Sequence, residues 1–194
     1  MAKREILQIN TPEGDAILRT RARKINRMDE ETMQLARDMV ETVVGVGVGL
    51  AAPQVGVPLR LIVVDIPPDS LEEDDPGFQM ALYNPQIVRR RGGKEVDEEG
   101  CLSLRNMYGP VERDLSVVVR AYDMQDRQIQ ITADGFLARV LQHEIDHLEG
   151  IMFTDHMENP DAQLRYVAPR DPNAPDDTED ETVEDATERT AVAE

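Results

Sequence analysis

The chain has 194 residues, of which 40% are hydrophobic, and it carries a formal net charge of −18. Such an acidic chain is not expected to bind nucleic-acid phosphates as its main activity. A single cysteine excludes an internal disulfide framework and predicts a reducing, cytoplasmic setting. The sequence has no run of about 18 apolar residues, and its first residues lack the apolar stretch of a secretory signal. We therefore predict neither a membrane span nor a secretory signal.

The first part of the chain predicts two helices. Residues 1–14 are expected to be extended, and a short basic helix is expected over residues 15–25. Asp29 is a good N-cap for a second helix, which should end near Val44, where glycines begin. Apolar residues recur along this second helix at helical spacing: Met33, Leu35, Ala36, Met39, Val40 and Val43.

The middle of the chain predicts strands. Residues 59–66 are apolar enough to form a strand that is mostly buried, and residues 67–77 form an acidic loop that contains prolines. Further strands are expected over residues 80–90, 117–122 and 128–131. Strands joined by short connections favour antiparallel pairing.

A last helix is predicted to open at Asp134 and Gly135 and to end at Gly150. Its apolar residues cover almost every side: Phe136, Leu137, Val140, Leu141, Ile145 and Leu148. Such a helix is expected to be buried, so its polar side chains must find partners. The predicted fold class is α+β, with antiparallel β-sheets packed around this central buried helix.

The end of the chain differs in composition from the rest. From Asp171 to Glu194 there are ten acidic residues and one basic residue. The net charge of this segment is therefore −9, half of the total of −18. Few apolar residues and high net charge are typical of disorder. We therefore predict a catalytic domain over residues 1–168 and a disordered acidic tail over residues 169–194, most simply a solubilising extension.

The pentapeptide from His143 to His147 has the pattern H-E-x-x-H and contains two of the three histidines. On a helix, residues four apart share one face, so both imidazoles can bind one metal ion from the same side. Glu144 lies beside them and can handle protons on a water molecule at that ion. The pattern alone also allows a chance match on an exposed helix.

A third metal ligand must come from elsewhere, and Cys101 is the best candidate because it is the only thiol. A thiolate and two imidazoles make a three-ligand site with an open position. Taken alone, Cys101 would more simply be a small buried hydrophobic residue.

The glycine-rich segment 45–54 does not fit a nucleotide-binding loop. Leu50 stands where G-x-G-x-x-G needs glycine, and no Gly-Lys-Ser/Thr follows. The segment is either a turn between a helix and a strand, or a loop whose glycines let a substrate approach closely.

Together, these segments resemble the peptide deformylase family. The family motifs G-x-G-L-A-A-P-Q, E-G-C-L-S and H-E-x-D-H occur here in the same order, over residues 47–54, 99–103 and 143–147. The general likeness extends from about Ile6 to about Met157 and leaves the acidic tail outside. The chain departs from the family at Arg105, where proline is usual, so the substrate side of the cleft is expected to differ.

The resemblance implies a metal-dependent hydrolase that removes the N-formyl group from the N-terminal formylmethionine of new polypeptides and releases formate. Cys101, His143 and His147 would hold one divalent ion, Fe²⁺ natively, with Zn²⁺, Ni²⁺ or Co²⁺ able to substitute. Glu144 would be the general base, while the Gln54 side-chain amide and the Leu102 backbone N–H would stabilise the oxyanion.

The resemblance also implies partners: nascent peptides as substrates, transient contact with the ribosome, and neither DNA nor membrane. Family members can dock on the ribosome through a basic C-terminal segment, a route that this acidic tail does not favour.

Other residues have open interpretations. An apolar pocket for the methionine side chain is expected at Val48, Gly49, Phe136 and Val140, although core packing would explain them nearly as well. By family analogy, Glu99 and Arg113 would form an internal ion pair that positions the second motif; the alternative is that both are simply solvated. Asp146 either accepts a hydrogen bond from a ligand histidine or belongs to a local network. His156 is interpreted as a surface histidine.

Two other functions compete with the deformylase hypothesis. H-E-x-x-H alone would also suit a zincin-like endopeptidase, against which stand the short chain, the cysteine ligand and the segment that contains Gln54. A purely structural metal site is the third possibility, but such a site has no use for Glu144.

Overall fold

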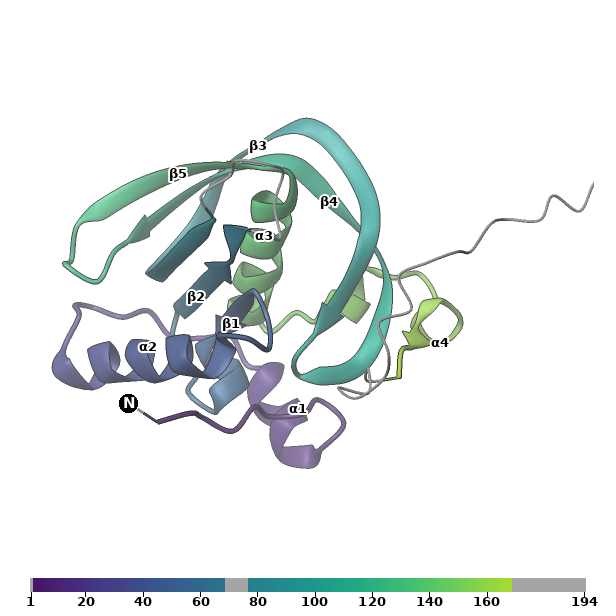
Figure 1. Cartoon of the computed structure of the whole chain (residues 1–194), viewed down its shortest axis with the longest axis horizontal. Helices are drawn as coiled ribbons and strands as arrows, with labels where there is room; N and C mark the ends of the chain where they lie inside the picture. The colour runs from purple at the N-terminus through teal and green to yellow at the C-terminus, as the bar shows by residue number, and fades with distance from the viewer. Residues whose placement is uncertain (1, 69–76, 169–194) are drawn as a thin grey trace, which may run out of the picture.

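The computed structural model describes residues 2–68 and 77–168 (Figure 1). The predicted loop over residues 67–77 and the predicted tail over residues 169–194 thus lie largely or wholly outside the described residues. In the described part of the chain, no helix is both long enough and apolar enough to cross a membrane. The elements, in chain order, are α1 (Pro12–Leu18), α2 (Glu30–Val43), β1 (Gly49–Ala51), η1 (Ala52–Val55), β2 (Leu61–Ile66), β3 (Phe78–Cys101), β4 (Leu104–Tyr122), β5 (Gln128–Asp134), α3 (Gly135–Glu149), η3 (Phe153–His156), α4 (Pro160–Gln163) and β6 (Arg165–Tyr166).

One antiparallel sheet contains all these strands. Its order is β1-β2-β3-β4-β5, and the short β6 pairs with β4. Figure 1 shows the long strands β3 and β4 curving over α3, so the helix lies on the concave side of the sheet. The predicted α+β class with antiparallel pairing is confirmed, but in one continuous sheet rather than several.

Strands β3 and β4 form a hairpin far longer than the sequence predicts. The prediction ended the first strand at residue 90, whereas β3 continues to Cys101. Gly92 and Gly93, with φ of 80° and 82°, lie at a shift in pairing register between Arg91 and Lys94, where the ladder is irregular. The residues beyond this irregularity are mostly exposed and charged, so backbone pairing rather than side-chain burial maintains the strand there.

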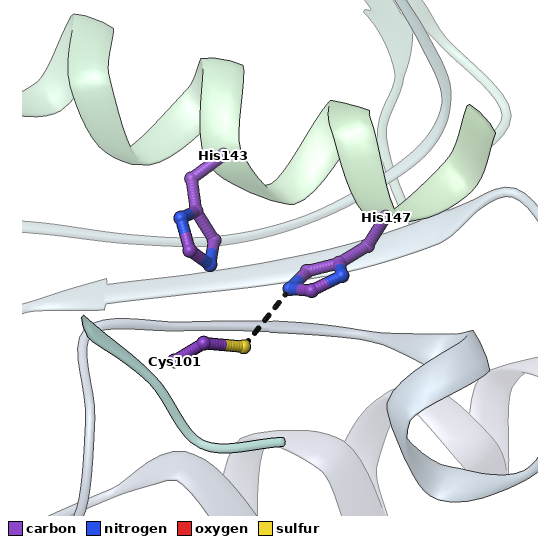
Figure 2. Close-up of side chains that lie close together, drawn as sticks. All are labelled: Cys101, His143 and His147. Atoms are coloured by element: carbon purple, nitrogen blue, oxygen red, sulfur yellow. Dashed lines mark hydrogen bonds between the residues drawn. The ribbon is translucent and has the colours of Figure 1, made fainter. Parts of the chain in front are cut away.

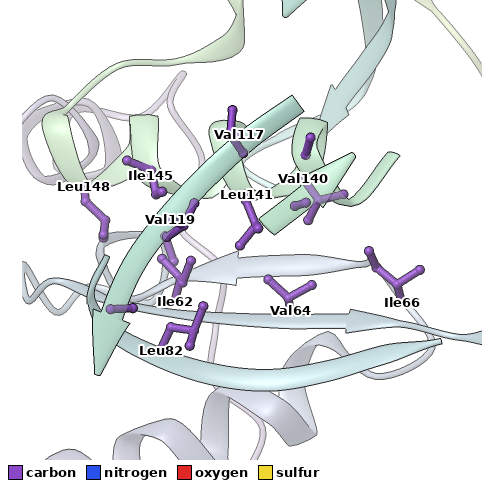
Figure 3. Close-up of a cluster of buried hydrophobic side chains, with 14 of the residues drawn as sticks. Ile62, Val64, Ile66, Leu82, Val117, Val119, Val140, Leu141, Ile145 and Leu148 are labelled. Carbon is purple, nitrogen blue, oxygen red and sulfur yellow. The ribbon is translucent and has the colours of Figure 1, made fainter. Parts of the chain in front are cut away.

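The core lies on both faces of the sheet, which explains the apolar run in β2. Ile62, Val64 and Ile66 point toward α3 in one cluster (Figure 3), while Leu61 and Val63 belong to a second cluster with α2. Alternate residues of a strand face opposite sides, so a strand covered on both sides has no polar alternation. Burying each such side chain contributes about 1.5–3 kcal/mol.

The second predicted helix is confirmed as α2. The Asp29 carboxylate accepts a hydrogen bond from the backbone N–H of Thr32 at 2.9 Å and so caps the helix, which ends at Val43. Leu35, Ala36 and Met39 are buried against the sheet, as the apolar spacing indicates.

The first predicted helix is wrong in its bounds. Helix α1 begins at Pro12, capped by the Thr11 hydroxyl, and ends at Leu18 instead of continuing over residues 15–25. The next segment makes tertiary backbone hydrogen bonds instead: Ala22 donates to the Leu148 carbonyl and Arg23 to the Pro58 carbonyl. These backbone N–H groups therefore have partners outside any helix.

Helix α3 begins and ends as predicted. Asp134 is its N-cap residue, and Gly150 closes it with a φ of 76°. A side chain at Gly150 would place its Cβ only 2.5 Å from the Arg19 carbonyl oxygen, so glycine is required there on two counts. The apolar side of α3 packs in the concave cluster shown in Figure 3.

Candidate active site

Two elements bring the predicted metal ligands together. The imidazoles of His143 and His147 extend from one side of α3 toward Cys101, which is the last residue of β3 (Figure 2). One donor atom from each of the three residues can be chosen so that all lie within 4.8 Å of one another. The cysteine sulfur is 3.3 Å from Nε2 of His147. Among the described residues, this trio is the one His/Cys/Asp/Glu group with the geometry to hold a metal ion.

The environment of Cys101 favours a thiolate. Burial alone would raise the pKa of the thiol, but His147 and His143 outweigh that effect and lower the pKa to about 5. The backbone N–H of Ser103 also points at the sulfur, 3.4 Å away. Because a thiolate rather than a thiol binds metals, the sulfur is prepared for coordination.

Glu99 orients His143. Its carboxylate oxygen Oε2 lies 2.8 Å from Nδ1 of the imidazole, and a carboxylate accepts hydrogen bonds, so Nδ1 is the donor and Nε2 is left to face the site. Burial would raise the pKa of Glu99, but the hydrogen bonds from His143 and Arg113 hold it well below its usual range. The imidazole thus has a charged acceptor behind it.

Two guanidinium groups hold Glu99 in place. Arg113 donates from Nε to Oε1 at 2.9 Å and from Nη2 to Oε2 at 3.0 Å, so the expected ion pair with Glu99 is present. Arg139 donates to the same Oε1 at 2.9 Å and also to the carbonyl oxygens of Val111 and Glu95. This clamp joins α3 to the β3–β4 hairpin.

Asp146 belongs to a local network and is not the acceptor for a ligand histidine. It pairs with Arg113, and its Oδ2 lies 2.7 Å from Nε2 of His156. His156 is exposed, as predicted, and lies outside the metal-ligand group. Of the two interpretations of Asp146, the structure favours the local network, since Glu99 takes the acceptor role.

Glu144 is buried beside the ligands, and the backbone at Gly49 approaches it closely. A Cβ added at Gly49 would meet Oε1 of Glu144 at 2.4 Å, so a larger residue there would displace the carboxylate. Burial raises the pKa of Glu144 to about 7, although His143 and His147 act in the opposite direction. A carboxylate with a pKa near neutrality suits a general base.

The Gln54 side chain has a fixed orientation. Its Oε1 accepts the backbone N–H of Ala51 at 2.7 Å, so its NH₂ group must face the other way. That group lies 3.3 Å from the Ser103 hydroxyl and 3.6 Å from the Cys101 sulfur. The amide therefore presents its donors toward the candidate metal site.

A cavity of about 440 Å³ opens onto this site. The four residues expected to form a methionine pocket all lie in the wall of this cavity: Val48, Gly49, Phe136 and Val140. Cys101, Leu102 and Glu144 line the same cavity. Gly47 also contributes, because Leu102 lies so close that a Cβ there would meet its Cδ1 at 3.0 Å. The glycine-rich segment thus forms one wall of a cleft rather than a nucleotide loop.

Sequence reasoning missed one site residue, Arg139, and one contact, the hydrogen bond between Glu99 and His143, and both had a signal. Arg139 lies four residues before His143, so the two share a face of α3. Glu99 lies two residues before Cys101 on a strand, so both point to the same side.

The residues present fit a divalent metal ion. Sulfur and imidazole nitrogen are donors that suit zinc, iron and similar ions. Within the described residues, Oε2 of Glu144 is buried without any hydrogen-bond partner, which is costly for a carboxylate unless the site supplies one. A water molecule at an ion between the three ligands would provide such a partner.

Comparison with known proteins gives a consistent result. The family model described as polypeptide deformylase matches residues 3–163. A peptide deformylase of Thermomicrobium roseum is 51% identical over 176 residues, which cover 90% of this chain and 94% of that protein. A peptide deformylase of Chloroflexus aggregans is 40% identical over 168 residues, which cover 82% of this chain and 89% of that protein.

Solved structures show the same likeness. The crystal structure of peptide deformylase from Ehrlichia chaffeensis in complex with actinonin superposes with a TM-score of 0.75 at 32% identity, covering 84% of this chain and 94% of that one. That of Thermotoga maritima gives a TM-score of 0.72 at 32% identity, over 82% of this chain and 100% of that one. The chain belongs to the peptide deformylase family.

Proposed function

We propose that Cys101, His143 and His147 hold one divalent metal ion at the centre of the family reaction. That reaction removes the N-formyl group from newly synthesised polypeptides and releases formate. The observation that carries the residue assignment is the convergence of one sulfur and two imidazoles, whose ligand atoms lie within 4.8 Å of one another, beside a cleft lined by Cys101 and His143.

The chain's own residues handle protons and charge. When bound, the ion supplies a Lewis acid that makes a water molecule acidic enough to lose a proton near neutral pH. Glu144 accepts that proton as the water oxygen bonds to the formyl carbon, and it delivers the proton to the amine nitrogen as the C–N bond breaks and formate forms. The Gln54 amide and the Leu102 backbone N–H donate to the oxyanion that develops on the formyl oxygen. The fixed orientation of Gln54 supports this role, because its donors already face the site.

We propose that the methionine side chain lies in the apolar part of the cleft. Val48, Gly49, Phe136 and Val140 are the residues proposed to contact it, since they lie in the wall of the same cavity as Glu144. Phe136 is 41% exposed, so it can gain burial when an apolar side chain binds.

Ferrous iron is the proposed native ion, with Zn²⁺, Ni²⁺ or Co²⁺ able to replace it. The proposed cellular setting is the cytoplasm, with nascent chains as substrates and only transient ribosome contact. We further propose that α3 is the central element of the fold, that residues 1–168 form the catalytic domain, and that the tail takes no part in catalysis.

Substitution of Glu144 tests the assignment. We expect Glu144→Gln to retain one metal ion per chain, because no ligand changes, but to lose formate release by at least about 10²-fold. Metal analysis and formate release from a formyl-methionyl peptide measure the two effects. Glu112→Gln, a matched change at an exposed strand position, should leave both unchanged. Substantial turnover by Glu144→Gln with its metal bound would refute the general-base role.

Substrate choice separates the deformylase from an endopeptidase. The metal-loaded protein should release formate from a formyl-methionyl peptide and leave internal peptide bonds intact. Cleavage of an internal bond in a peptide with a blocked amino terminus, without formate release, would contradict the proposal.

A further inference from the structure

The β3–β4 hairpin carries an irregularity in the wall of the cleft. The pairing register shifts between the pair Gly100–Tyr108 and the pair Cys101–Leu104, so the three residues from Arg105 to Met107 have no opposite residue on β3. Asn106, in the middle of the three, has a φ of 61°. Such bulges commonly redirect a side chain near an active site.

Strand β6 holds this bulge in place. Tyr166 pairs with Met107, and Arg165 pairs with Tyr108. The backbone N–H of Val167 donates to the Asn106 carbonyl at 2.8 Å. The bulge is therefore an ordered part of the cleft wall, fixed by a strand from another part of the chain.

Arg105 is the exposed charged residue of that wall that has no partner among the described residues. Besides His143, five charged side chains line the cavity. Three of them already have partners: Glu99 and Arg139 pair with each other at 2.9 Å, and Glu98 pairs with Arg165 at 2.9 Å. The fourth, Glu144, is the buried candidate base. In the part of the chain that the structure describes, no hydrogen bond or ion pair involves the exposed side chain of Arg105.

We infer that Arg105 is a specificity-determining residue that binds a carboxylate of the peptide substrate beyond the formylated methionine. This inference rests on the proposed function. When the formyl group lies beside Glu144, the rest of the peptide must leave through the mouth of the cavity, whose wall includes Arg105. A guanidinium group is a good partner for a carboxylate and repels a cationic side chain.

The chemistry identifies the carboxylate but leaves two sources for it. One is an aspartate or glutamate side chain among the first residues after the methionine, and the other is the terminal carboxylate of a short peptide. An exposed pair of this kind changes affinity by roughly two- to five-fold and weakens in high salt.

A series of formyl-methionyl peptides tests the inference. Asp, Asn or Lys is placed at each of the three positions after the methionine, and each peptide is made both with an amidated and with a free C-terminus. Formate release gives kcat/KM for the metal-loaded protein. At one or more of the three positions, we expect kcat/KM to decrease in the order Asp, Asn, Lys; otherwise we expect kcat/KM to be higher for peptides with a free C-terminus. Either difference should be about two- to five-fold at low salt. If the amidated peptides still show the preference for Asp, the carboxylate that Arg105 binds is that of the side chain and not the terminal one.

Variants assign the effect to Arg105. Arg105→Ala should remove the discrimination, Arg105→Glu should invert it, and Arg105→Lys should keep part of it. Arg91→Ala is the matched control: Arg91 is also exposed on the same hairpin but lies outside the cavity wall, so the preference should persist.

Two results overturn the inference. Wild-type protein that hydrolyses the Asp, Asn and Lys peptides equally well, with either C-terminus, would show that no carboxylate is recognised. A preference that persists in Arg105→Ala and Arg105→Glu would assign it to another residue. Failure to hydrolyse any peptide, the neutral ones included, would instead count against the proposed function itself.

Discussion

At the scale of single residues, the geometry around Gln54 shows how a neutral side chain can be prepared for catalysis. The backbone N–H of Ala51 holds the amide oxygen at 2.7 Å, which leaves the amide donors facing Cys101 and Ser103. A donor that is already oriented needs no reorganisation when charge develops on the substrate. This orientation supports the proposed role of Gln54 in catalysis rather than in metal binding.

We expect Gln54→Ala to lower kcat by about 10²–10³-fold with metal content unchanged, because one oxyanion donor is lost. Formate-release kinetics with metal analysis on the same sample check this. Gln128→Ala, at an exposed position of β5, is a suitable control. A kcat within a few fold of the wild type would remove Gln54 from the mechanism.

The same scale shows what sequence could and could not predict about the site. Cys101 and the H-E-x-x-H residues stand out by residue type and spacing alone. The spacing to His143 places Arg139 on the same face of α3, but the carboxylate and carbonyl groups that β3 and β4 bring next to it are set by the tertiary structure. Asp146 was ambiguous because the sequence does not show which groups lie beside it; the tertiary structure brings Arg113 to it from 33 residues away.

At the scale of elements, helix α2 fastens the N-terminal segment to the domain. Asp38, buried on α2, accepts from the backbone N–H of Ala2 at 3.1 Å and pairs with Arg4 at 2.8 Å. Further along, Leu7 donates to the Gln54 carbonyl and Ile9 to the Ser103 carbonyl. The segment thus runs from α2 to the turn that follows Cys101.

Asp38 should give the fold a pH-dependent contribution. The hydrogen bonds from Ala2, Gln34 and Arg4 lower the pKa of this carboxyl below its usual value. Because the folded-state pKa is lower than the unfolded-state pKa of about 3.9, the charged carboxylate stabilises the fold at pH values above the unfolded-state pKa. That stabilisation is lost as the pH falls through the folded-state pKa. Asp38→Asn should therefore be less stable than wild type at neutral pH, and the gap should narrow below about pH 4.

Urea unfolding of wild type, Asp38→Asn and the exposed control Glu5→Gln at several pH values measures this effect. A stability gap that stays constant down to strongly acidic pH would show that the Asp38 charge makes no contribution.

Elements also differ in how well sequence predicts them. The apolar spacing and the caps gave α2 and α3 nearly to the residue, because those signals are local. The distal halves of β3 and β4 were missed because long-range backbone pairing, rather than apolar alternation, maintains them. Helix α1 was placed too late because the backbone after Leu18 bonds to Leu148 and Pro58, which lie far away in sequence.

At the scale of the whole molecule, the described domain contains every proposed catalytic group. The proposed metal ligands, Glu144, Gln54 and the cleft wall all lie between residues 46 and 147. The sequence after residue 168 contains no His or Cys and is rich in Asp, Glu and Thr. We propose that this tail acts on solubility alone.

Removal of residues 169–194 should leave kcat/KM for a short formyl-methionyl peptide within about two-fold of the full chain, because no proposed catalytic residue is lost. Formate release by the two proteins, at equal metal content, measures this. A large loss would mean that the tail contributes to catalysis or to the fold.

The central claim is that one sulfur and two imidazoles bind a common ion, and X-ray absorption at the metal edge tests it most directly. Protein purified without oxygen, with one ion per chain, should show one sulfur ligand beside nitrogen or oxygen ligands, and Cys101→Ser should lose the sulfur contribution. A spectrum of the wild-type protein without any sulfur ligand would contradict the account.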